Sequence, residues 1–373
     1  MRGPGLRLEL EPALTATFAY GVSAAGGSAR VCARVGDRIL DLADAAKRRG
    51  FGQVDLLTAP TLDPLLAAGP DVWRATHAAV REWAADDDVR SLADVDLLLP
   101  FTVADYVDFY ASEHHARNVS RILRPGQPEL RENWRHQPIG YHGRAGTVVV
   151  SGTSVRRPRG PVPTEGGVQL RATARLDVEA EMGFVVGVPS ALGSPVSVDE
   201  FADHVFGVVL LNDWSARDIQ AWESVPLGPF LGKSFLTSVS PWVVPLDALD
   251  AVRIRSPSAD TDLPAYLVET APWGLDIDLE LEVNGEVVSR PPYRAMHWSP
   301  AQLLAHLTVN GASLRTGDLV ASGTVSGAAP DQVGSLLERW AGERFLADGD
   351  EVVIRAGGAV DLGEVRGTVA PAR

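Results

Sequence analysis

The segment from Val205 to Leu211 constrains this chain more than any other, because it contains no polar residue. A half-buried strand alternates polar and apolar side chains, so a strand without a polar face is expected to be buried on both sides. Charged residues follow at once, from Asp213 to Lys233. Charges at the edge of a dry core are costly unless they are paired or bound to a metal. The sequence therefore predicts a functional site where this strand leaves the core.

Composition narrows the class of protein and its partners. The chain has 373 residues, and its 36 glycines and 26 prolines favour short strands and turns over a helical bundle. A net charge of -14 argues against nucleic acid and anionic membrane surfaces, so we expect a small-molecule partner. The single cysteine, Cys32, excludes an internal disulfide framework and a Cys-based zinc site. Met1 to Gly5 carries no apolar signal segment and no run reaches membrane-spanning length, so a cytoplasmic protein is expected.

Two domains are expected, one over residues 1–100 and one over residues 101–373. In the first, residues 30–42 are typical of two strands about a Gly36-Asp37 turn, and helices are expected over 43–49 and 71–85. In the second, the segment from Arg156 to Gly167 is rich in Pro, Gly and Arg and is expected to form a mobile loop.

A candidate base stands near the start of the second domain. Ser112 can cap a helix that runs to Arg124, which places His115 in its first turn. The positive end of the helix dipole disfavours an imidazolium, so His115 is expected to stay neutral and able to accept a proton. A plain surface histidine beside His114 is the alternative that spacing leaves open.

Alternating acids form a candidate metal site. A strand over residues 175–187 would place Asp177, Glu179 and Glu181 on one face and continue into an apolar run. The same alternation over residues 276–282, before a hairpin turn, indicates an ordinary solvated face, so alternation alone does not decide. Carboxylate oxygens suit Mg²⁺ or Ca²⁺, and Asp213 could join them.

The cations and the last polar segments leave further alternatives. Arg217 and Gln220 would share a helical face, and simple counter-ions are the alternative role for Arg217 and Lys233. Residues 321–327 form a tight turn, with Glu338 further along. No Gly-x-Ser-x-Gly elbow occurs, which favours an activated water over a serine nucleophile.

Six motifs follow one another in order along the chain. They are Asp108-Phe-Tyr-x-Ser-x-x-His115, Pro138-x-Gly-Tyr-His-Gly-Arg144, Asp177-x-Glu-x-Glu-Met182, the segments Asn212 to Gln220 and Pro226 to Phe235, and Ser322-Gly-Thr-x-Ser-Gly327. Together they resemble the fumarylacetoacetase family over essentially the whole chain. The resemblance implies a mainly β (α+β) fold, with a small SH3-like N-terminal β-barrel and a C-terminal mixed β-sandwich roll, and a homodimer. It also implies metal-dependent hydrolysis of the C–C bond of fumarylacetoacetate to fumarate and acetoacetate, the last step of tyrosine and phenylalanine catabolism.

The resemblance also implies a role for each matching residue. His115 would be the general base and Glu338 would orient it. The oxyanion would be stabilised by Arg217, Gln220 and Lys233. The substrate would be held by Tyr110, Arg124, Tyr141, Gln220 and Thr324. One Mg²⁺ or Ca²⁺ would be bound at Asp108, Glu179, Glu181, Asp213, Lys233 and Thr237.

One position departs from the family pattern. Ser224 stands where the family usually has a substrate-contacting tyrosine, which leaves the preferred diketo acid open. An acylpyruvate-type hydrolase or a metal-dependent decarboxylase of the same superfamily is the first alternative. A non-catalytic, cation-binding β protein is the second.

Overall fold

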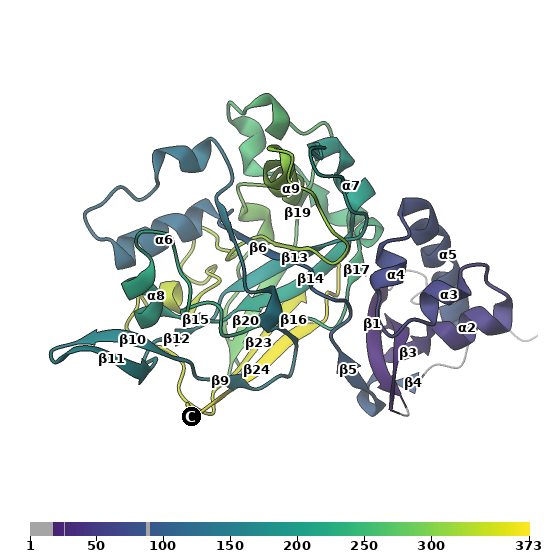
Figure 1. The fold of residues 1–373 in the computed structure, drawn as a ribbon, viewed down its shortest axis with the longest axis horizontal. Helices are drawn as coiled ribbons and strands as arrows, with labels where there is room; N and C mark the ends of the chain where they lie inside the picture. The colour runs from purple at the N-terminus through teal and green to yellow at the C-terminus, as the bar shows by residue number, and fades with distance from the viewer. Residues whose placement is uncertain (1–17, 26, 87–89) are drawn as a thin grey trace, which may run out of the picture.

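The computed structural model describes residues 18–25, 27–86 and 90–373 (Figure 1). The segment Met1 to Gly5, for which the sequence predicts no signal peptide, lies outside the described residues. Within the described chain, no helix combines the length and the apolar composition that crossing a bilayer would require.

The N-terminal unit is a curled antiparallel sheet with helices beside it (Figure 1). Its strand order is β4-β3-β2-β1-β5, and the predicted turn at Gly36 and Asp37 joins β2 to β3. Asp41 caps α2 by accepting the backbone N–H of Asp44. Since β4 and β5 pair with no further strand in the described ranges, the expected small β-barrel is an open half-barrel. The described elements are β1 Phe18–Ala25, β2 Ser28–Val35, β3 Arg38–Asp41, α2 Leu42–Arg49, α3 Val54–Leu57, α4 Asp63–Leu66, α5 Pro70–Asp86, β4 Arg90–Ser91 and β5 Asp96–Leu98.

The C-terminal unit is built on an eight-stranded mixed sheet. Its order is β7-β6-β22-β13-β14-β16-β8, and the short β17 also pairs with β14. β22 runs parallel to β6 and β16 runs parallel to β8, whereas β13 and β14 are antiparallel neighbours. The strands are β6 Tyr106–Phe109, β7 Gly140–His142, β8 Val148–Val150, β13 Ala180–Val186, β14 Val205–Asp213, β16 Thr237–Val239, β17 Val244–Pro245 and β22 Leu319–Ala321.

A second sheet, ordered β21-β20-β23-β24-β9, packs against β14 and completes the expected mixed β-roll. The hairpin predicted after residue 283 is present, with Asn284 and Gly285 at its turn. The strands of this sheet are β9 Val155–Arg156, β20 Asp278–Val283, β21 Glu286–Ser289, β23 Glu351–Gly357 and β24 Glu364–Ala370. Two short pairs are β12 Leu176–Asp177 with β15 Ser215–Ala216, and β18 Arg253–Ile254 with β19 Gly274–Leu275. The α-helices are α6 Glu113–Leu123, α7 Phe201–His204, α8 Arg217–Glu223, α9 Pro300–Thr308 and α10 Leu336–Arg339.

Strand β14 is buried along its whole length, as its apolar run predicts. Val208 and Leu210 pack in the core that also contains Ile354 of the second sheet. Phe206 and Val209 pack in a different core, which the N-terminal unit shares. β14 therefore has two dry faces, and each buried aliphatic side chain contributes about 1.5–3 kcal/mol to holding it in place. The charged residues at its end are attached to a rigid element.

The segment from Arg156 to Gly167 differs from the prediction of a mobile loop. Its residues form strand β10, Arg159–Thr164, and the turn to β11, Gly167–Ala172, in an antiparallel hairpin that projects at the left of Figure 1. Proline is tolerated there because each strand of a two-stranded hairpin has a free edge that needs no N–H donor. At Gly160 a Cβ atom would lie 2.7 Å from Ile219 Cδ1, so glycine allows α8 to pack closely on the hairpin.

Candidate active site

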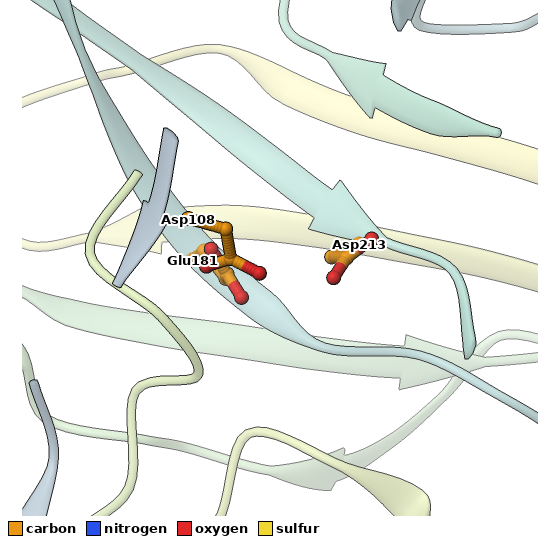
Figure 2. A group of neighbouring side chains, drawn as sticks. All are labelled: Asp108, Glu181 and Asp213. Carbon is orange, nitrogen blue, oxygen red and sulfur yellow. The ribbon is translucent and has the colours of Figure 1, made fainter. Parts of the chain in front are cut away.

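Three buried acidic side chains from three strands of the main sheet lie close together (Figure 2). Asp108 comes from β6, Glu181 from β13 and Asp213 from the last position of β14. One carboxylate oxygen of each lies within 4.8 Å of the others. Like charges about 4 Å apart repel by about 4 kcal/mol at an effective dielectric constant of 20, so this cluster needs compensating positive charge.

Burial and repulsion between carboxylates raise the pKa values of Glu181 and Asp108. Burial, with Asp108 and Asp213 nearby, raises the pKa of Glu181 well above its usual value. Burial raises the pKa of Asp108 to about 6, although the Arg144 guanidinium opposes the shift. Among the described residues, neither Glu181 oxygen nor Asp108 Oδ1 has a hydrogen-bond donor. Buried oxygens without donors suit a hard cation.

Two buried cations compensate part of the negative charge. Arg144 Nη2 donates to Asp108 Oδ2 and to Asp213 Oδ2, at 2.8 Å in each case. Lys233 Nζ donates to Asp213 Oδ2 at 2.7 Å and to Glu179 Oε2 at 2.5 Å. Burial acts to lower the pKa of Lys233, but Asp213 and Glu179 outweigh it and the pKa is raised. The ammonium therefore stays charged.

Glu179, implied as a metal ligand, is held by cations in this structure. Its Oε1 accepts from Arg217 Nη1 at 2.7 Å, and its Oε2 accepts from Lys233. Burial acts to raise the pKa of Glu179, but Lys233 and Arg217 bring it well below its ordinary value. The Thr237 hydroxyl lies beside the cluster, 3.4 Å from Asp213 Oδ1.

Arg217 starts helix α8 and reaches back to Asp177 on β12. Its Nε donates to Asp177 Oδ2 at 2.7 Å, and its Nη1 donates to Gln220 Oε1 at 3.1 Å. Asp177 also accepts the backbone N–H groups of Leu336 and Leu337, at 2.8 and 3.1 Å. Asp177 therefore fixes Arg217 and the start of α10 and takes no part in the acidic cluster. Arg217 Nη2 is buried and has no acceptor among the described residues.

His115 lies in the first turn of α6, where its backbone N–H donates to the Ser112 hydroxyl at 3.2 Å. Its Nδ1 lies 2.6 Å from Glu338 Oε2, and its Nε2 lies 3.8 Å from Glu179 Oε1. Asn118 Nδ2 donates to the other Glu338 oxygen at 2.9 Å. Burial acts to raise the pKa of Glu338, but His115 and these hydrogen bonds lower it. In the neutral ring, a carboxylate at Nδ1 selects the tautomer with its proton on that nitrogen, which leaves Nε2 as the acceptor.

A cavity of about 630 Å³ lies beside these groups. The Tyr110 ring meets the His115 ring edge-on, with 5.3 Å between centroids. Burial raises the pKa of Tyr110 and of Tyr141, so both phenols remain hydrogen-bond donors. All the residues implied to hold the substrate line this cavity: Tyr110, Arg124, Tyr141, Gln220 and Thr324.

Two further features shape the cavity wall. A Cβ atom at Gly323 would lie 2.0 Å from the Phe109 carbonyl oxygen, so glycine brings the turn with Thr324 against β6. Ser224 also lines the cavity, but its hydroxyl donates to the backbone carbonyl of Gln220. The serine hydroxyl is therefore committed to its own helix.

Sequence reasoning assigned no role to two arginines of the site. Arg144 stood in a quoted motif, and only the folded chain brings it to two carboxylates. Arg131 lines the cavity together with Arg124, and neither has a carboxylate partner among the described residues. Nearby Glu129 is already paired with Arg117. The sequence signal was the excess of arginines over acids between Arg117 and Arg131, which leaves Arg124 and Arg131 at the cavity.

Buried acids and an imidazole–carboxylate pair around one cavity of a mixed β-roll define an enzyme equipped to activate water, a hydrolase. The family model described as Fumarylacetoacetase N-terminal matches residues 18–103, and the one described as Fumarylacetoacetate (FAA) hydrolase C-terminal matches residues 105–370. The chain belongs to the fumarylacetoacetate hydrolase family.

Individual relatives agree with this membership. Fumarylacetoacetase from Bos taurus is 40% identical to this chain, and the alignment covers 95% of each protein. The one from Arabidopsis thaliana is 38% identical and covers 92% of this chain and 91% of its own. A solved fumarylacetoacetate hydrolase from Exiguobacterium antarcticum shares the fold, with a TM-score of 0.62 at 19% identity over 96% of this chain and 100% of that one. So does a maleylpyruvate hydrolase from Sphingobium sp. SYK-6, solved with manganese(II) and pyruvate, with a TM-score of 0.56 at 17% identity over 95% and 100%.

Proposed function

We propose that this chain is a fumarylacetoacetase, which hydrolyses fumarylacetoacetate to fumarate and acetoacetate at the end of tyrosine and phenylalanine catabolism. Relatives of that name are 35–40% identical to it. The observation that carries the proposal is that His115, paired with Glu338, lines the same cavity as Asp108 and Glu181 of the acidic cluster. Hydrolysis of a C–C bond between carbonyls needs both a base for water and charge stabilisation for the departing fragment.

One divalent cation, Mg²⁺ or Ca²⁺, is part of this proposal. The undonated oxygens of Glu181 and Asp108 fit such an ion, because it takes oxygen ligands. The fold neighbour solved with manganese(II) supports a divalent ion in this fold. When bound, the ion supplies Lewis-acid polarisation of the substrate oxygens. The residues that would hold it, directly or by supporting contacts, are Asp108, Glu179, Glu181, Asp213, Lys233 and Thr237.

The reaction begins at His115, whose Nε2 takes a proton from water while Glu338 holds the ring through Nδ1. The hydroxide adds to the ketone carbon of the fumaryl group, and the carbonyl electrons move to its oxygen. Within the described part of the chain, Arg217 Nη2 has no acceptor and Lys233 Nζ uses two of its three N–H groups, so both can donate to this oxyanion together with Gln220.

Collapse of the alkoxide breaks the C–C bond. The bonding electrons leave with the acetoacetate fragment as an enolate, which takes the proton back from His115. The new carboxyl group then releases its own proton to solvent, which gives fumarate. Tyr110, Arg124, Tyr141 and Thr324 hold the substrate, whose carboxylates suit a guanidinium.

Ser224 favours one second candidate, hydrolysis of a related diketo acid of the acylpyruvate type. A serine bonded to its own helix cannot replace a phenol that reaches into the cavity. Purified protein should be given fumarylacetoacetate and an acylpyruvate in turn, with and without chelator, while the diketone absorbance is followed. We expect chelator-sensitive loss of fumarylacetoacetate. Turnover of the acylpyruvate alone would overturn the proposal.

A homodimer, a cytoplasmic location and a domain division into residues 1–100 and 101–373 complete the proposal. Exposed apolar side chains at Trp222, Val225, Leu227 and Phe230 offer surface that a second copy would cover. Sedimentation equilibrium is expected to give twice the chain mass, and a monomer at every concentration would refute the dimer.

Fractionation of cells is expected to recover the protein in the cytosol. Because one core spans both units, residues 101–373 alone are expected to be less stable than the whole chain.

A further inference from the structure

Arg144 occupies an unusual place in the site. It follows strand β7 with a φ of 62°, a left-handed conformation that residues other than glycine seldom adopt. Its side chain is only 4% exposed. A guanidinium is rarely buried without specific partners, so both the backbone and the burial indicate that the surrounding structure holds Arg144 in place.

The partners of Arg144 connect the acidic cluster to the cavity wall. Its Nη2 donates to Asp108 Oδ2 and Asp213 Oδ2 at 2.8 Å, and to the Tyr106 hydroxyl at 3.3 Å. Its guanidinium carbon lies 4.5 Å from the centroid of the Tyr106 ring and 4.8 Å from that of Tyr141. Cation–π contacts with two rings leave the guanidinium little freedom to swing away.

These contacts use only part of the carboxylate surface. Arg144 takes Oδ2 of each aspartate, while Asp108 Oδ1 has no donor among the described residues and Asp213 Oδ1 has a long contact of 3.4 Å from Thr237. Both oxygens of Glu181 are also without donors. The oxygens needed by a cation are thus separate from those that the guanidinium holds.

We propose that Arg144 is a positioning residue: it fixes Asp108 and Asp213 with one oxygen each available to the divalent ion, stays in place when the ion binds, and holds Tyr141 at the cavity wall. The inference rests on the proposed function, because it assumes that the acidic cluster binds an ion. Hydrogen bonds to ligating carboxylates orient them, and removing such a bond typically weakens metal binding by about 10–100-fold. The opposing view is that Arg144 is a counter-ion which the metal must displace.

Calorimetric titration of chelator-stripped protein with Mg²⁺ and with Ca²⁺ separates the two views without measuring activity. For Arg144→Met we expect affinity about 10–100-fold weaker than wild type. For Arg144→Lys we expect a smaller loss, since an ammonium keeps the charge but lacks the planar guanidinium that lies over the Tyr106 and Tyr141 rings. Arg157→Met is the matched control, because that side chain is 10% exposed, bonded to Asp348 and outside the cavity. Its ion affinity should equal that of wild type.

Equal or tighter ion binding by Arg144→Met would overturn the inference and establish a displaced counter-ion. If that variant does not fold, as judged by its melting curve in chelator, Arg144→Lys decides by the same criterion. Wild-type protein that binds neither ion would instead overturn the metal site of the proposed function, and the inference with it.

Discussion

Replacing Glu338 with glutamine tests whether this carboxylate sets the tautomer of His115. Oε1 of Glu338 accepts from Asn118 at 2.9 Å, and Oε2 accepts from His115 Nδ1 at 2.6 Å and from the Ser335 hydroxyl at 2.7 Å. A glutamine that keeps the Asn118 bond must present its NH₂ group to Nδ1. An amide donor there requires Nδ1 to be the acceptor, so the ring proton moves to Nε2 and the base is lost.

The alternative orientation of the glutamine is disfavoured. It would place the NH₂ group of the glutamine against the NH₂ group of Asn118. The Asn118 amide could rotate to avoid this, but it would then lose the 3.0 Å hydrogen bond that its Oδ1 accepts from Arg121. That loss costs about 1 kcal/mol, and even then a neutral amide would not stabilise the imidazolium that forms when Nε2 takes the proton. We therefore expect Glu338→Gln to lower kcat by about 10²–10⁴, the usual worth of a general base, or roughly 3–5 kcal/mol of barrier.

The assay is turnover of fumarylacetoacetate followed by its absorbance, with a melting curve to establish that the variant is folded. Ser326→Ala is the control, because it removes a 3.1 Å hydrogen bond to Glu338 and leaves the carboxylate in place. It should stay within about tenfold of wild type, in line with the loss of one ordinary hydrogen bond. A folded Glu338→Gln variant with wild-type kcat would refute the tautomer argument.

Three further predictions concern the same site. His115→Ala should lower the rate by about 10²–10⁴ with metal content unchanged, measured by elemental analysis, and loss of the metal would make its role structural. Glu181→Gln should weaken the binding of divalent ions in a titration, and an unchanged titration would remove Glu181 from the ligands. Since burial raises the pKa of Glu181, the charged side chain destabilises the fold at neutral pH, so the variant should melt at a higher temperature than wild type in chelator. Because the pKa of Glu338 is lowered in the fold, its carboxylate stabilises the protein above the ordinary glutamate pKa of about 4.3, and that stability is lost as pH falls through the folded pKa. The melting temperature should therefore fall less steeply with decreasing pH for Glu338→Gln than for wild type, and an equal pH dependence would contradict this.

Local chemistry made several elements predictable from the sequence. The run Val205 to Leu211 required two dry faces, and the second sheet and the N-terminal unit supply them. Ser112 marked the start of α6 because its hydroxyl caps the helix at His115. Such features depend on neighbours in the chain, so a sequence reports them directly.

Contacts between distant segments were not predictable in the same way. Alternation placed Asp177 with Glu179 and Glu181, yet Asp177 pairs with Arg217 and the start of α10. The role of Arg144 depends on β6 and β14, which are joined in one sheet only in the folded chain. The prolines of β10 suggested a loop because a free hairpin edge, which tolerates them, cannot be recognised from composition.

The central claim is that an activated water, with His115 as its base, cleaves the C–C bond of a diketo acid. Reaction in heavy-oxygen water (H₂¹⁸O), with the products analysed by mass spectrometry, tests it most directly. We expect one heavy oxygen atom per turnover in fumarate, in the carboxylate formed from the ketone, and none in the carboxylate of acetoacetate. Fumarate without the label, or release of carbon dioxide in place of acetoacetate, would contradict it.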